Sequence, residues 1–245
     1  MNQTPTNRVL LGMLTPSSNT VLEPVTTEMI RGLGEVSAHF SRFRVTEITL
    51  TDDGLGQFDQ DRRLAAADLL ADAKADVIAW NGTSAGWLGF EHDESLCASI
   101  EQGTGARATT SILANVELFR RNRVKRFGLV TPYTDDVQAK VIENFEGAGF
   151  ECVAEAHLGI SDNFSFSEVG SEALETMTEE VAKASPDGIA IICTNLRAAP
   201  LVEALEARFG ITIYDSIAVV VHQALELAGV DVSRVRGWGR LFSRH

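Results

Sequence analysis

Short apolar runs alternate along the chain with segments in which apolar residues recur every three or four positions. The runs predict buried strands and the periodic segments predict amphipathic helices. We expect strands at 9–14, 36–45, 76–80, 106–111, 126–131, 150–158, 188–193 and 211–216. We expect helices at 20–31, 61–74, 87–102, 135–149, 172–184, 199–210 and 217–229. This alternation indicates an α/β fold, with parallel sheets covered by helices on both faces.

Similar segments recur at the ends of these strands, which suggests an internal duplication. The pairs are GMLTPSSNT (12–20) with GLVTPYTDD (128–136), DVIAWNGTS (76–84) with DGIAIICTN (187–195), and TTSI (109–112) with YDSI (214–217). Loops at the carboxyl ends of strands build the ligand sites of open α/β sheets. We therefore predict two pseudo-symmetric Rossmann- or flavodoxin-like lobes, 1–112 plus 222–245 and 113–221, with the active site in the cleft between them. The alternative is that all Rossmann-like halves look alike.

Amino-acid composition and net charge limit the kinds of molecule that the protein is expected to bind. The 245 residues are 44% hydrophobic, which is enough for a sizeable core, and carry a formal net charge of −13. An acidic surface repels nucleic acid and anionic membranes, so neither is expected as a partner. Three cysteines without CxxC spacing argue against a disulfide scaffold or a zinc site, and the polar start MNQTPTNR lacks the apolar core of a signal peptide. We expect a cytoplasmic protein, and a homo-oligomer is the alternative to a monomer.

The most informative pair in the repeat sets Gly82 against Cys193. Gly82-Thr83-Ser84 is matched by Cys193-Thr194-Asn195, so one side of the predicted cleft carries a thiol and the other only hydrogen. A thiol can act as an acid or base on a carbon next to a carboxylate, and hydroxyls such as those of Thr83, Ser84 and Thr194 can stabilise the enediolate that forms. The alternative for Cys193 is a small buried core residue.

Two further loops contribute candidates for substrate binding. LTPSSNT contains Pro16, Ser17 and Asn19 where a strand meets a helix, although a helix N-cap would explain one of its polar residues. Tyr133 occupies the equivalent loop of the second unit, where its phenol could donate to a carboxylate or simply pack.

The segments LTPSSNT, NGTS, TPYTDDV, SDNFSF, IICTN and GWGRLF, in this order and spacing, resemble the arylmalonate decarboxylase and maleate cis–trans isomerase group. That group belongs to the cofactor-independent aspartate/glutamate racemase superfamily. The similarity runs from about Arg8 to Phe242. It implies two pseudo-symmetric α/β lobes, an active site between them, and no cofactor or metal.

The resemblance also implies roles for the strand-end residues. Racemases and maleate isomerases of the superfamily carry a cysteine in both lobes, whereas glycine in the first lobe with one second-lobe cysteine is the decarboxylase pattern. Gly82 and Cys193 match that pattern, in which the lone thiol protonates the enediolate from one face. Thr83, Ser84 and Tyr133 match residues that help to bind the remaining carboxylate.

The chain also departs from the decarboxylases. Asn19 and Asn163 match positions at which maleate isomerases hold the substrate carboxylates. We therefore expect a cofactor-independent decarboxylase of a substituted malonate or small dicarboxylate. The alternatives are a maleate isomerase or Asp/Glu-type racemase, and a non-catalytic protein that binds small acids.

Overall fold

The computed structural model describes residues 8–243, so most of the polar start MNQTPTNR lies outside it. The strands are β1 (Val9–Pro16), β2 (Val36–Phe43), β3 (Val77–Trp80), β4 (Arg107–Thr110), β5 (Arg126–Thr131), β6 (Glu151–His157), β7 (Gly188–Ile191) and β8 (Thr212–Asp215). The α-helices are α1 (Leu22–Ile30), α2 (Asp52–Gly56), α3 (Gln60–Asp72), α4 (Ala85–Leu88), α5 (Phe90–Thr104), α6 (Ser111–Arg121), α7 (Asp135–Gly147), α8 (Ser171–Ala182), α9 (Val202–Phe209) and α10 (Ser216–Leu227). Short 3-10 turns cover Ser165–Glu168, Ala199–Leu201, Val232–Arg234 and Arg240–Phe242.

These strands form two four-stranded parallel sheets, which confirms the predicted α/β class. The orders are β2-β1-β3-β4 and β6-β5-β7-β8, so the two sheets have the same topology, as two copies of one unit would. The central strands β3 and β7 are buried throughout because helices cover both faces of each sheet. Within the described residues, no helix is both long and apolar enough to cross a membrane.

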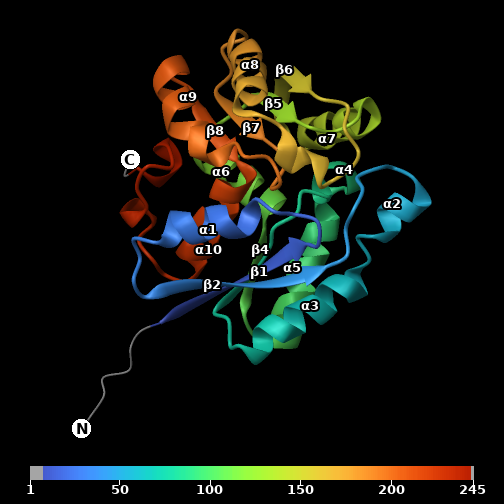
Figure 1. The fold of residues 1–245 in the computed structure, drawn as a ribbon, viewed down its shortest axis with the longest axis vertical. Coiled ribbons are helices and arrows are strands. Elements are labelled where there is room, and N and C mark those ends of the chain that lie inside the picture. Colours follow the sequence, from blue (N-terminus) through green and yellow to red (C-terminus); the bar gives the residue numbers. More distant parts are fainter. Residues whose placement is uncertain (1–7, 244–245) are drawn as a thin grey trace.

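Two helices join the units, each packing against the sheet that it does not follow (Figure 1). Phe119 of α6 makes ring contacts with Phe127 and Tyr214 of the second sheet, at centroid distances of 5.7 and 4.8 Å. Helix α10 contacts β3 and β4 of the first sheet as well as β8. The predicted lobe boundaries, 112/113 and 221/222, fall inside α6 and α10, and the division into lobes stays a prediction.

Some elements differ from the sequence-based expectation. Helix α6 was not predicted, although SILANVELFRR has helical periodicity and the Thr110 hydroxyl accepts a hydrogen bond from the Leu113 amide, as an N-cap does. The helix expected at 87–102 is divided into α4 and α5 by Gly89, whose φ of 111° lies outside the range that other residues favour. Strand β7 ends at Ile191, so Cys193 lies in the loop that follows.

Equivalent glycines in β1 and β5 let a helix approach each sheet closely. A Cβ on Gly128 would lie 2.0 Å from Cγ1 of Val181 on α8. A Cβ on Gly12 would lie 3.1 Å from Cδ1 of Leu70 on α3. The repeated glycine therefore belongs to helix–sheet packing in both units.

We predict that Gly128→Ala destabilises the protein by about 1–3 kcal/mol, since the new methyl group overlaps Val181 and neither the strand nor α8 can move freely. Gly147→Ala is the control, because a Cβ there meets nothing within 4 Å. Urea denaturation of both variants measures the effect. Equal midpoints for the two variants would contradict this account of the packing.

Candidate functional site

A small cavity lies where the strand-end loops of the two units meet. Its lining combines the ends of β1 and β3, the loops after β2, β3, β5, β6 and β7, one residue between α2 and α3, and one residue of α4. The lining residues are Pro16, Val45, Ile48, Phe58, Trp80, Gly82, Thr83, Trp87, Tyr133, Asn163, Cys193 and Thr194. The internal repeat thus brings Cys193 and Gly82 to one cavity, as the sequence predicted.

Seven of the ten residues predicted for the site line this cavity: Pro16, Gly82, Thr83, Tyr133, Asn163, Cys193 and Thr194. Ser17, Asn19 and Ser84 lie near these residues in the chain but are not part of the lining. The apolar wall of the cavity was not predicted from the sequence; it consists of Val45, Ile48, Phe58, Trp80 and Trp87. The apolar run DVIAW predicts a strand that ends at Trp80, but it does not indicate that the indole lines a cavity.

Cys193 is buried and protonated at neutral pH. Burial raises the pKa of its thiol to about 12, although a hydrogen bond from the Asn195 amide, at 3.3 Å from Sγ, acts in the opposite direction. A thiol with this pKa can donate a proton, whereas the nucleophilic thiolate is scarce.

Tyr133 and Thr83 form a hydroxyl pair beside the thiol. Tyr133 Oη and Thr83 Oγ1 are 2.6 Å apart, one from each unit of the repeat. Burial raises the pKa of Tyr133 well above its ordinary value, and the nearby Cys193 adds to the effect. The edge of the Trp87 ring packs against the phenol at a centroid distance of 5.2 Å. The pair therefore keeps its protons and can donate to an anion in the cavity.

The loop that carries Cys193 is hydrogen-bonded to the first unit. Asn19 Nδ2 donates to both the carbonyl and Oγ1 of Thr194, each at 3.1 Å, and Thr194 Oγ1 donates to the Asn81 carbonyl at 2.9 Å. The Thr20 amide donates to Asn195 Oδ1 at 3.0 Å. These bonds hold the thiol loop against the loop that contains Gly82.

Both polar atoms of the Asn19 side chain are hydrogen-bonded to other residues of the protein. Its Oδ1 accepts from the amides of Val21 and Leu22, both at 2.9 Å, at the start of α1. Its Nδ2 donates to Thr194. The predicted role of Asn19 in holding a carboxylate stays a prediction, and the observed contacts position Thr194.

Ser84 and Ser17 differ in how their hydroxyls are used. Ser84 precedes α4 and is buried, and its Oγ has no hydrogen-bond partner among residues 8–243. Ser17 Oγ donates to the carbonyl of Val45 at 3.3 Å and accepts from its amide at 3.2 Å, so it supports the loop after β2.

Two loops, one from each unit, meet over the cavity and close it. The Ile48 amide donates to the Ser161 carbonyl at 2.8 Å, and the Asn163 amide donates to the Thr46 carbonyl at 3.0 Å. We call these paired segments, 44–48 and 161–163, the loop seam. The space in the cavity that can hold the centre of a water molecule is about 20 Å³, enough for about one water. The cavity as it stands is therefore too small to hold a dicarboxylate.

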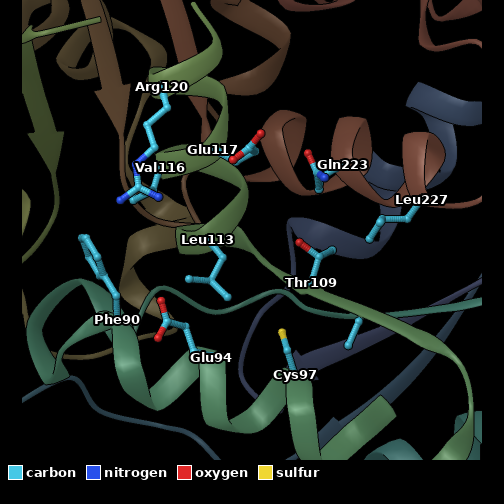
Figure 2. Close-up of a pocket in the computed structure, with 11 residues that line it drawn as sticks. Phe90, Glu94, Cys97, Thr109, Leu113, Val116, Glu117, Arg120, Gln223 and Leu227 are labelled. Carbon is cyan, nitrogen blue, oxygen red and sulfur yellow. The ribbon is translucent and has the colours of Figure 1, made fainter. Parts of the chain in front are cut away.

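A larger groove, of about 350 Å³, lies elsewhere, between α5, α6 and α10 (Figure 2). Cys97 points from α5 toward Thr109 in this groove, and burial raises the pKa of its thiol to about 12. The groove shares no lining residue with the strand-end cavity. In residues 8–243, no group of three or more His, Cys, Asp and Glu side chains is placed to hold a metal ion.

Titratable groups with perturbed pKa values that converge on a buried cavity at strand ends are features of a small-molecule site in an α/β protein. The family model described as "Arylmalonate decarboxylase" matches residues 12–242. The chain therefore belongs to the arylmalonate decarboxylase family, which confirms the resemblance seen in the sequence motifs.

Relatives within this family have two different activities. A maleate isomerase of Nocardia farcinica is 29% identical over 243 residues, or 94% of each chain. An arylmalonate decarboxylase of Bordetella bronchiseptica is 27% identical over 171 residues, or 69% of this chain and 71% of the relative. The structure of the Nocardia farcinica isomerase with a covalently bound succinylcysteine intermediate superimposes with a TM-score of 0.89, at 24% identity over 97% of this chain and 99% of that chain. Membership of the family therefore leaves decarboxylation and isomerisation open.

We predict that Ser18→Ala loosens the loop seam. Ser18 Oγ donates to the Val45 carbonyl at 2.6 Å and accepts from Asn163 Nδ2 at 2.7 Å, so one hydroxyl joins both loops. Its loss is expected to destabilise the seam by about 1 kcal/mol and to speed hydrogen exchange of the Ile48 and Asn163 amides about fivefold. Hydrogen–deuterium exchange read at single-amide resolution measures both.

Ser99→Ala is the matched control. Ser99 is also partly buried and accepts a bond from Gln60 Nε2 at 2.8 Å, but this bond joins α3 to α5. Unchanged exchange at both seam amides in Ser18→Ala, or the same increase in Ser99→Ala, would show that Ser18 does not hold the seam.

Proposed function

We propose that the protein is a cofactor-independent decarboxylase of a substituted malonate or similar small dicarboxylate. Cys193 is the proton donor and the hydroxyls beside it stabilise the intermediate. The observation that carries the proposal is a buried, protonated thiol in a cavity whose opposite strand-end loop offers glycine. The family that the chain belongs to supports it.

The proposed reaction needs no electron acceptor. The bond between the α-carbon and one carboxylate breaks, carbon dioxide leaves, and the electron pair spreads into the remaining carboxylate as an enediolate. Cys193 then gives its proton to the α-carbon, and the thiolate recovers a proton from solvent. The high pKa that burial gives the thiol favours this return of the proton.

The hydroxyl pair of Tyr133 and Thr83 is suited to the developing charge. Both groups remain protonated, lie beside Cys193 and are shielded from bulk water. One of their two protons lies in the bond between the two oxygens, which leaves one hydroxyl to donate, and a donor placed in this way is worth about 2.7–4 kcal/mol in the transition state. Thr194 lines the same cavity and is oriented by Asn19. In this proposal Asn163, whose Nδ2 is bonded to Ser18, orients the second carboxyl through its side chain.

Maleate isomerisation is the second candidate, because most of the curated relatives matched are maleate isomerases. The resemblance to the family implies that maleate isomerases carry a cysteine in both lobes, and Gly82 occupies the first-lobe position here. An isomerase would therefore need Cys193 itself to add to the alkene as a thiolate. The raised pKa of the thiol disfavours that role.

The first prediction from this proposal concerns turnover. The wild type is expected to decarboxylate 2-methyl-2-phenylmalonate to one enantiomer of 2-phenylpropionate, since a proton source on one face gives one product. Cys193→Ala is expected to lower kcat at least about 10²-fold, the usual contribution of a positioned general acid. Chiral chromatography of the product and initial rates provide the measurements.

Cys97→Ala is the control, because Cys97 lies in the other groove and is expected to leave both rate and enantiomer unchanged. Maleate is assayed in parallel. Turnover of maleate with no turnover of malonates would replace the decarboxylase by the isomerase. Binding of both acids without any turnover would identify a binding protein.

The second prediction concerns pH. Because burial raises the pKa of Cys193 to about 12, the protonated form persists as pH rises, and a free thiol with a pKa of about 8.5 would already be half ionised at pH 8.5. The kcat for decarboxylation is therefore expected to stay level from pH 6 to 10, because only about 1% of a thiol with a pKa of about 12 is ionised at pH 10. A kcat–pH profile from pH 6 to 10 tests this, and an alkaline midpoint at or below pH 8.5 would contradict a buried thiol as the acid.

A further inference from the structure

The indole of Trp80 fills the space in front of Gly82. Trp80 is the last residue of β3, is fully buried and lines the cavity together with Cys193. A Cβ built on Gly82 would lie 1.9 Å from Cζ2, 2.3 Å from Cε2 and 2.4 Å from Cη2 of this ring. The position opposite the thiol is therefore occupied by aromatic carbon, although the residue there is glycine.

The ring, and not the backbone, excludes a side chain at this position. Gly82 is not among the glycines with positive φ, so its backbone conformation would admit any L-residue. The indole packs against Phe43 at a centroid distance of 5.0 Å and has no exposed surface. Because the surroundings of a buried indole are close-packed, the ring cannot turn away cheaply.

We propose that Trp80 closes the face opposite Cys193 to a second proton-transfer group, so that proton transfer stays restricted to the face of the thiol. The stereochemical part of this inference rests on the proposed function. The overlap between the Trp80 ring and a side chain at position 82 does not depend on it. It makes Trp80, together with Gly82, the specificity-determining pair that separates one-sided protonation from two-sided racemisation.

Racemisation requires a second proton-transfer group in the space that the Trp80 ring fills. A thiolate on one face removes the α-proton, the electron pair enters the carboxylate as an enediolate, and a thiol on the other face returns a proton to carbon. Thiol and thiolate have then exchanged roles, and no other reactant is consumed. A cysteine at Gly82 could supply the second group only if Trp80 were smaller.

The first test is a stability cycle that requires no substrate. Gly82→Ala is expected to lower Tm by about 5 °C or more in the Trp80 background, because the methyl group overlaps the ring. In the Trp80→Leu background the same substitution is expected to change Tm by less than about 2 °C. Trp80→Met replaces Trp80→Leu if the leucine variant does not fold.

Gly86→Ala is the matched control in both backgrounds. Gly86 is also buried and close to the site, but its Cβ would lie 3.4 Å from Ile112 Cδ1, an ordinary contact. A Gly82→Ala substitution that is tolerated equally in both backgrounds, or is no more harmful than Gly86→Ala, would overturn the proposed block.

The second test measures exchange of the product's α-proton in D₂O. Gly82→Cys/Trp80→Leu is expected to exchange 2-phenylpropionate with solvent at least about tenfold faster than Gly82→Cys alone and to erode its enantiomeric purity. Gly82→Cys alone is expected to show no gain over wild type. Exchange by the single variant would refute the role of Trp80.

The two tests separate this inference from the proposed function. If the stability cycle shows coupling but neither wild type nor double variant acts on malonates or their products, the steric block stands and the proposed reaction fails. If the wild type decarboxylates stereospecifically but the cycle shows no coupling, the reaction stands and Trp80 is not the residue that restricts it.

Discussion

The hydrogen bonds of Thr194 and Asn195 to the first unit, those of Thr194 buried and that of Asn195 partly buried, are the constraint on which the site depends. They bond to Asn19, Asn81 and Thr20 in the first repeat, so neither unit can slide without leaving polar groups unpaired. A buried group that loses its partner costs about 1–3 kcal/mol, more than a typical bond contributes. The thiol loop and the glycine loop are therefore held at one separation, and chemistry that needs a fixed donor becomes possible.

The same burial decides which chemistry the thiol can perform. Removal from water disfavours the thiolate of Cys193 and raises its pKa, which makes the group a persistent acid and a poor nucleophile. It also strengthens donors such as the hydroxyl pair of Tyr133 and Thr83, since electrostatic interactions are stronger in a low dielectric. Within one cavity, burial thus keeps the thiol protonated and strengthens the hydroxyl donors beside it. It opposes covalent addition, which needs the thiolate.

The sequence predicted the position of Cys193 opposite Gly82, because repeats at strand ends carry equivalent residues to equivalent places. It could not predict that the indole of Trp80 lies over Gly82, since the direction of a side chain two residues away depends on packing against Phe43. Nor could it show that Asn19 is committed to Thr194, because that contact joins residues 175 positions apart. Local pattern identifies elements and strand ends, whereas the use of each polar atom depends on tertiary contacts.

Two kinds of contact between the units differ in how easily they open. The hydrogen bonds of Thr194 are buried. If one of them breaks, its donor and acceptor remain without water unless the two units separate. The seam bonds at Thr46 and Asn163 lie next to the exposed residues Glu47 and Asp162, and a bond that water can replace contributes a net of about 0.5–1.5 kcal/mol. Asn195 Nδ2 also donates to the Asn163 carbonyl, so the thiol loop touches the seam at this point and would lose that bond if the seam opened. The bonds of Thr194 to Asn19 and Asn81 do not involve the seam, and they keep the thiol loop attached to the first unit.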